Sequence, residues 1–324
     1  MNFENISSQV KKVKYNLKDI SIKIIVNNFL NISKALNFYD IKDFENIDKV
    51  KKYLDSKDLN FQTKSNYYKS IRTILISYNF DKDILIKYDE IINEYNKQYS
   101  EINASGSFIS EKQKNNFISE DEFKKFMKDF KTEIVKEDLL NKIKDSDSPD
   151  FRKLQMYIIL NIYLKFPLRA DIGDLIYIQK REFNKISKEE QKNNNYLLFF
   201  NNKFSIILNK FKTDKVEGKK DIEIKDRTLN PLLKKYVSLV GKGYLFKNNK
   251  EEPFSPNLLS QTIIRFFEKR LNKRVSINII RKAYLTDKYE GNETIKDMKK
   301  DSYIMGHSIK TQQLIYNKNT KKTQ

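Results

Sequence analysis

The 324-residue sequence contains no cysteine, no tryptophan and a single histidine. Without cysteine the protein has no disulfide, no thiolate nucleophile and no cysteine-ligated zinc or iron–sulfur cluster. One histidine, His307, cannot build a multi-histidine metal centre, although it can serve one active site. An all-carboxylate magnesium site stays compatible with this composition. Seven glycines and five prolines disfavour a turn-rich all-β fold and favour long helices.

Long apolar runs are also missing. No stretch of 18 or more apolar residues occurs, and the beginning of the chain, residues 1–5, has no hydrophobic signal-peptide core. We therefore expect an intracellular protein that is neither secreted nor embedded in a membrane.

The charge is strongly one-sided. The chain carries 63 Lys+Arg against 43 Asp+Glu, a net charge of +20, and residues 201–300 alone hold 24 basic and 12 acidic residues. Such an excess predicts a polyanionic partner, and without an apolar anchor nucleic acid is favoured over an anionic membrane. A general lysine excess from an A/T-rich genome, which the many Lys, Asn, Ile, Tyr and Phe residues suggest, explains part of the charge.

Apolar periodicity predicts a mainly α-helical protein with a small β-sheet. Residues 1–100 form one helical domain, residues 101–117 a polar linker, and residues 118–324 a second domain. Helices of the first domain are expected at 17–38, from the cap Asn46, from Gln62, and at 84–95.

In the second domain a capping box at Ser119 opens a helix. A nearly all-apolar helix follows at 151–166, and Pro167 ends it. Strands are expected at 175–178, 196–200, 204–208 and 221–224, followed by helices that begin at 255, 276 and 308.

Three short stretches carry residues suited to phosphate chemistry. Arg169 follows the apolar helix, Asn278 and Arg281 lie three residues apart on one helix face, and His307 precedes Tyr316 by nine residues. A lysine-rich segment, residues 209–215, lies between the first and second stretches. Each stretch by itself also fits a purely structural interpretation, in which the arginines form surface ion pairs and the tyrosine packs against the hydrophobic core.

Their order resembles that of the tyrosine recombinase (phage-integrase) family. In that family an Arg follows a helix, a Lys lies on a β-hairpin, a His-x-x-Arg box comes next, and a Gly-His precedes the nucleophilic Tyr. The likeness covers residue 118 to the end and implies a mixed α/β catalytic domain. The first hundred residues resemble the family's helical, SAM-like core-binding domain, with residues 43–47 and 63–68 in the expected places.

The resemblance assigns roles to these residues. Tyr316 would be the nucleophile, Arg169 and Arg281 the phosphate clamp, and His307 a hydrogen-bond or proton-relay partner. The hairpin lysine that protonates the leaving oxygen would be Lys212, which precedes a threonine as in many members, with Lys210 as the alternative. Cleavage of this type needs neither a metal nor another cofactor.

Two positions depart from the family pattern. Asn278 stands where the second box usually has His or Lys, and asparagine can donate a hydrogen bond but cannot transfer a proton. Ile172 occupies the place of an acidic residue, so Asp171 is the nearest candidate to orient Arg169. Only eight residues follow Tyr316, which leaves the mode of assembly open.

The resulting prediction is a site-specific DNA recombinase that cleaves and rejoins DNA through a covalent 3′-phosphotyrosine intermediate. Its partner would be double-stranded DNA, bound by a homotetramer on paired sites, with accessory DNA-bending proteins in some cases. The expected task is integration or excision of the genome of a virus or mobile element. A type IB topoisomerase and a non-catalytic DNA-binding protein on the same fold are the alternatives.

Overall fold

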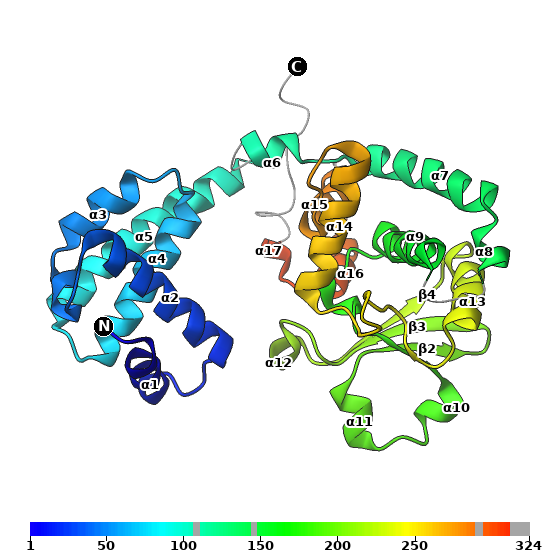
Figure 1. Cartoon of the computed structure of the whole chain (residues 1–324), viewed down its shortest axis with the longest axis horizontal. Helices are drawn as coiled ribbons and strands as arrows, with labels where there is room; N and C mark the ends of the chain where they lie inside the picture. Colours follow the sequence, from blue (N-terminus) through cyan, green and yellow to red (C-terminus); the bar gives the residue numbers. More distant parts are fainter. Residues whose placement is uncertain (106–110, 144–147, 289–293, 312–324) are drawn as a thin grey trace. The chain divides into compact units, whose positions relative to one another are not determined.

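The computed structural model describes residues 1–105, 111–143, 148–288 and 294–311 (Figure 1). The chain divides into two compact units, Met1–Ile109 and Ser110–Gln324. Each unit has its own hydrophobic core.

The first unit is entirely helical within its described residues. Its core contains Phe29, Phe44, Tyr68 and Tyr88, which are all fully buried. The Asn46 side chain accepts a hydrogen bond from the amide of Lys49, which confirms the predicted helix start. The elements are α1 (Phe3–Val13), α2 (Asp19–Leu36), the 3-10 helix η1 (Ile41–Glu45), α3 (Ile47–Asp55), α4 (Phe61–Ser77) and α5 (Lys82–Ala104).

The second unit combines helices with one small sheet. The Ser119 and Glu122 side chains each bind the other's backbone amide, which confirms the predicted capping box. The helices are α6 (Glu111–Asn115), α7 (Glu120–Lys136), α8 (Leu139–Lys142), α9 (Pro149–Lys165), the 3-10 helix η2 (Ala170–Ile172), α10 (Lys180–Phe183), α11 (Lys188–Asn193), α12 (Asp214–Glu217), α13 (Leu229–Val240), α14 (Pro256–Leu271), α15 (Ile277–Lys288), α16 (Ile295–Met305) and α17 (Ile309–Thr311).

Five strands form the sheet, in the order β4-β3-β2-β1-β5. Strands β1 and β2 run parallel, which requires a crossover, and α10 and α11 supply it; the other pairs are antiparallel. The bounds are β1 (Ile176–Gln179), β2 (Tyr196–Phe200), β3 (Lys203–Leu208), β4 (Lys220–Ile224) and β5 (Gly243–Tyr244). The four predicted strands are thus confirmed to within one residue.

Helix α9 lies at the centre of the second core. Its residues are buried on nearly every side, as expected for a helix that is apolar all round. The helix ends at Lys165 because Phe166 precedes Pro167 and takes an extended conformation. This end of the core helix carries the chain directly to Arg169.

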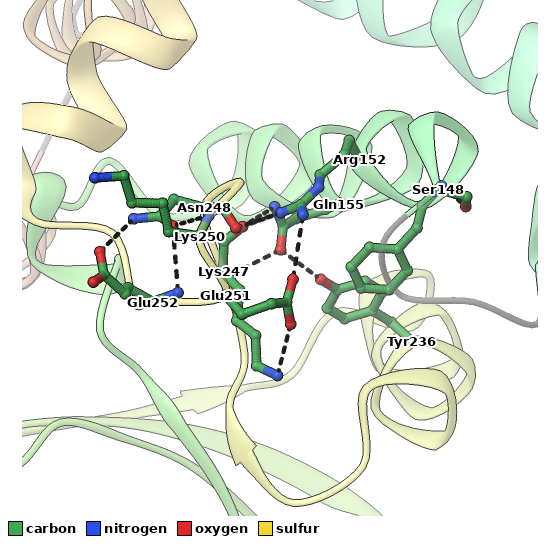
Figure 2. Close-up of polar contacts among 10 residues, drawn as sticks. Ser148, Arg152, Gln155, Tyr236, Lys247, Asn248, Lys250, Glu251 and Glu252 are labelled. Carbon is green, nitrogen blue, oxygen red and sulfur yellow. Dashed lines mark hydrogen bonds and ion pairs between the residues drawn. The ribbon is translucent and has the colours of Figure 1, made fainter.

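A buried polar network holds the loop after β5 against α9 (Figure 2). Gln155, which is 3% exposed, donates to the carbonyl of Lys247, and its own carbonyl oxygen accepts bonds from the Lys247 amide and the Tyr236 hydroxyl. Arg152 donates to the carbonyls of Lys247 and Asn248. The loop therefore has a fixed path, because each of these buried polar atoms is bonded.

No helix in the described part of the chain is both long and apolar enough to cross a membrane.

Candidate active site

The turn at Gly306 is the centre of the site. Helix α16 ends there because Gly306 takes the left-handed conformation, with φ 72°. The amide of His307 bonds the carbonyl of Ser302, and the amide of Gly306 bonds that of Tyr303, which is the Schellman pattern of helix ends. This turn fixes the backbone of His307 directly after the helix.

Three cationic side chains converge on this helix end from three other elements. Lys220 of β4 donates to the carbonyl of Tyr303 over 2.6 Å, and Arg281 of α15 donates to that of Met305 over 2.7 Å. Arg169 donates to the carbonyl of Gly306. The last carbonyls of a helix carry partial negative charge and lack partners within the helix, so cations stabilise them.

The close fit explains why the turn contains glycine. A Cβ atom at Gly306 would lie 2.9 Å from Nζ of Lys220 and 3.2 Å from Nη1 of Arg169. Gly306 therefore satisfies two demands at once, the positive φ and the close approach of two cations.

Arg281 is almost completely buried, with 1% exposure. Besides Met305, it donates from Nε to the carbonyl of Pro167 over 3.0 Å and from Nη1 to Oδ1 of Asn278 over 3.3 Å. It thereby ties the segment after α9 to the end of α16. A guanidinium suits this position because its donors form a planar, rigid fork and keep their charge when buried.

Arg169 caps η2 and is half-buried. Its Nη1 donates to Oγ1 of Thr213 over 3.0 Å, and its carbonyl accepts a bond from the Tyr163 hydroxyl. Behind it, Gly173 and Phe254 are so close that a Cβ at Gly173 would lie 2.5 Å from the Phe254 carbonyl oxygen. The loop fixed by Gln155 thus supports the segment that carries Arg169.

Lys220 is 1% exposed and forms an ion pair with Glu217 at 2.7 Å. Burial lowers the pKa of Lys220, the Glu217 carboxylate opposes this shift, and the positive charges of Arg169 and Arg281 add to it. Three positive charges therefore lie close together at this helix end, and the Glu217 carboxylate offsets them in part.

His307 is half-buried, and its Nδ1 lies 3.2 Å from the Ser308 carbonyl oxygen. Burial, and next the charge of Arg281, lower the pKa of His307 to about 4. The imidazole is therefore neutral at physiological pH, so it can donate or accept a hydrogen bond.

Asp171, which we expected to orient Arg169, lies near the cluster and interacts with Arg169 through charge. Burial raises the pKa of Asp171 to about 6, although the charge of Arg169 opposes the rise. The hydrogen bonds described for the Arg169 side chain go to Thr213 and Gly306. Asp171 thus influences Arg169 through charge, and the orientation of the guanidinium comes from the other two residues.

The structure brings Arg169, Arg281 and His307 together, as the sequence had suggested. Asn278 is exposed at the edge of the cluster and touches it through Arg281. Tyr316 lies outside the described residues, and of the predicted last helix only Ile309–Thr311 is described.

The lysine at the cluster is a different one from the two singled out in the sequence. Lys210 and Lys212 are exposed in the connection between β3 and β4, whereas Lys220 is buried among the arginines. Strand alternation could have revealed it, because Lys220 shares a strand face with Ile222 and Ile224. The predicted strand began one residue too late, at Asp221, and so excluded it.

Comparisons with known proteins give a match in structure alone. No family model and no curated protein matches the sequence. The structure is similar to that of the Tn1549 transposon integrase in complex with transposon right end DNA, with a TM-score of 0.51, 13% identity, and coverage of 99% of this chain and 96% of that one. It is also similar to the XerH site-specific recombinase bound to palindromic difH substrate, with a TM-score of 0.50, 16% identity, and coverage of 95% and 80%.

The chain has the tyrosine-recombinase fold. The predicted fold class, mainly helical with one small sheet, is confirmed. In this fold the cation cluster consists of Arg169, which follows α9, Lys220, the first residue of β4, and Arg281 on α15. All three side chains meet at the end of α16.

Proposed function

We propose that this protein is a site-specific DNA recombinase that cuts and rejoins DNA through a tyrosine. The observation that supports this best is the convergence of Arg169, Arg281 and Lys220 on the helix end that directly precedes His307. Such a cluster suits a phosphodiester, whose negative charge increases as a pentacoordinate transition state forms.

The two arginines would bind the non-bridging oxygens of the scissile phosphate. Guanidinium groups match phosphate oxygens in geometry and keep their charge at any physiological pH. Their anchoring to backbone carbonyls would hold them in place before DNA binds. Preorganised donors of this kind contribute about 3 kcal/mol or more each to transition-state stabilisation.

Tyr316 would be the nucleophile, nine residues after His307. Its phenol would pass its proton to neutral His307 or to water as the oxygen attacks phosphorus, forming a 3′-phosphotyrosine bond while the bond to the 5′-oxygen breaks. The departing oxygen takes a proton from a general acid. The ester conserves the bond energy, so rejoining is the reverse reaction and requires no ATP.

For the general acid we propose Lys220 ahead of Lys212. Lys220 is buried beside both arginines, and its pKa is lowered by burial, which suits a proton donor at neutral pH. Neutral His307 would relay a hydrogen bond or proton at the same phosphate. Asn278 would hold Arg281 in place without moving a proton.

Double-stranded DNA is the proposed substrate, and the solved structures of similar fold include complexes with transposon right end DNA and with a palindromic difH substrate. Recombination of two duplexes would use four protomers on paired sites, with DNA-bending proteins as helpers. Integration or excision of a viral or mobile genome is the proposed task.

Trapping the covalent intermediate tests this proposal. The full-length protein is incubated, in EDTA, with a pool of nicked duplexes of randomised sequence, and the products are separated on a denaturing gel. We expect a protein–DNA adduct with the wild type and none with Tyr316→Phe. The control variant Tyr15→Phe, which changes an exposed tyrosine of the first unit, should form as much adduct as the wild type. Sequencing the captured DNA then identifies the site.

Two results would contradict the proposal. If no adduct forms from the pool, the protein does not cleave by this route and a non-catalytic DNA-binding role replaces it. If an adduct forms but supercoiled plasmid is relaxed without any recombinant product from paired captured sites, the protein is a topoisomerase.

A further inference from the structure

We infer that Glu217 is a positioning residue for this reaction, because its carboxylate holds the Lys220 ammonium and, through Thr213, the Arg169 guanidinium. The inference rests on the proposed function and extends it to a residue outside the cation cluster. No sequence signal pointed to Glu217.

The contacts form a continuous chain across the site. One carboxylate oxygen of Glu217 lies 2.7 Å from Nζ of Lys220, and the other accepts a hydrogen bond of 2.7 Å from Oγ1 of Thr213. The same Thr213 oxygen accepts from Nη1 of Arg169 over 3.0 Å. One carboxylate therefore fixes the place of two of the three cations.

The local fold explains how Glu217 reaches both partners. Helix α12 is a single turn, so Thr213 and Glu217, four residues apart, lie on one side of it. Gly218 ends the turn with φ 69° and sends the chain into β4, whose first residue is Lys220. The turn thus serves to bring a carboxylate back onto the strand's first side chain.

The Glu217 carboxylate opposes the two effects that lower the pKa of Lys220, which are burial and the positive charges of Arg169 and Arg281. Lys220 also interacts with a further charged group, Asp171. On its remaining sides are the carbonyl and ring of Tyr303 and the ring of Phe211. Glu217 is the carboxylate in direct contact, so it favours the protonated form that a general acid requires.

Glu217 contributes little to the hydrophobic core. Its side chain is 23% exposed and belongs to a four-residue helix, and no residue of that helix is buried. A substitution here should leave the hydrophobic core intact. A change in catalysis would therefore report on Lys220 and Arg169 and not on folding.

The test compares pH profiles of single-turnover cleavage for the full-length wild type, Glu217→Gln, Glu217→Asp and Asp214→Asn on the captured DNA site. Asp214 is the matched control, since it lies on the same turn and bonds the amide of Lys215. We expect Glu217→Gln to lower the maximal rate about tenfold and to move the alkaline limb about one pH unit downward. Glu217→Asp should recover most of the rate, and Asp214→Asn should match the wild type.

A second measurement does not depend on catalysis. NMR titration of the lysine side chains, with Lys220 assigned by Lys220→Arg, should show Lys220 losing its proton at lower pH in Glu217→Gln than in the wild type. DNA affinity should change less than twofold.

Suppose that the wild type forms the adduct, and that Glu217→Gln has the same alkaline limb and the same Lys220 titration as the wild type. That result would overturn this inference and leave the proposed function standing. Absence of a covalent adduct in the wild type would overturn both.

Discussion

The ammonium group of Lys220 and the backbone carbonyl oxygen of Tyr303 lie 2.6 Å apart, which joins the first residue of β4 to the last turn of α16. Arg281 and Arg169 make the same kind of bond to the carbonyls of Met305 and Gly306. The cation cluster is thus assembled on main-chain atoms, and its geometry depends on where one helix ends.

Gly306→Ala should damage the site, and Gly241→Ala, at the end of α13, is the control. Both glycines have a positive φ, of 72° and 71°, but a Cβ would crowd Lys220 and Arg169 at Gly306 and would meet no atom of the described chain within 4 Å at Gly241. We expect backbone strain to cost about 1–2 kcal/mol in the left-handed conformation of Gly306 and about 1–3 kcal/mol at Gly241, where ψ is −153°, measured by urea unfolding. Only Gly306→Ala should also lose adduct formation; equal activity of the two variants would contradict the crowding argument.

Arg281→Lys should be far more harmful than Arg274→Lys. Lysine cannot bond Pro167 and Met305 simultaneously with a planar fork, so we expect a loss of about 2–4 kcal/mol in stability and at least 100-fold in adduct formation. Arg274 forms an exposed pair with Glu268, and its replacement should change stability by less than about 0.5 kcal/mol. Thermal unfolding and the gel assay measure the two effects. Comparable losses in both variants would be inconsistent with a special role for Arg281.

His307 should make the protein less stable in acid. Its pKa is about 4 in the folded chain, below the ordinary value of 6.5, so the unfolded chain binds a proton first and stability falls as the pH drops from 6.5 to 4. Asp171, with a pKa raised to about 6, acts in the opposite sense over much of this range.

Comparing variants separates the two groups. Between pH 6.5 and pH 4, the free energy of unfolding of His307→Gln should fall by about 2 kcal/mol less than that of the wild type, as measured by urea unfolding at several pH values. Parallel pH curves for the two proteins would show that His307 keeps an ordinary pKa.

Lys220→Met and Lys212→Met should separate chemistry from DNA binding. The first removes the buried ammonium and should slow adduct formation at least 100-fold, without much change in affinity. The second removes an exposed charge and should leave the rate within about threefold; if Lys212 contacts a phosphate, the slope of log affinity against log salt falls by about 1. The reverse pattern of rates would return the role of general acid to Lys212.

Gln155→Leu should weaken the loop that supports Arg169. It removes the partner of the Lys247 amide and one of two partners of the Lys247 carbonyl and of the Tyr236 hydroxyl, and we expect a loss of about 1–3 kcal/mol by urea unfolding. Gln155→Glu keeps the hydrogen-bond acceptor and loses the donor, so its stability should lie between those of the wild type and Gln155→Leu. A Gln155→Leu protein as stable as the wild type would show that the network in Figure 2 is dispensable.

Much of the fold was predictable because strong local signals agree with it. The apolar run that became α9 and the alternation in β2 and β3 are long enough to specify their elements, and the caps at Asn46 and Ser119 fixed two helix starts. Helices α1, α13 and α16 and strand β5 were missed. Helix α16 has a weak apolar face, and β5 is two residues long and is held by pairing with β1.

The sequence points to members of the candidate site where the residue types are rare. One histidine and two arginines among apolar neighbours stand out in a chain this rich in lysine. Lys220 and Glu217 do not, because their environment arises only when β4 pairs with β3 and meets α16. Burial of a single lysine among many is decided by tertiary packing, which a local pattern does not contain.

Anchoring through carbonyls has an evolutionary consequence. Every residue type has a backbone carbonyl, so the attachment points of Arg169, Lys220 and Arg281 do not themselves depend on side-chain identity in α16, whereas Gly306 is constrained by its conformation and by the two cations beside it. This chain is 13–16% identical to the two solved structures of similar fold. Searches for such proteins in divergent genomes should weigh helix termini and their cationic neighbours above side-chain similarity.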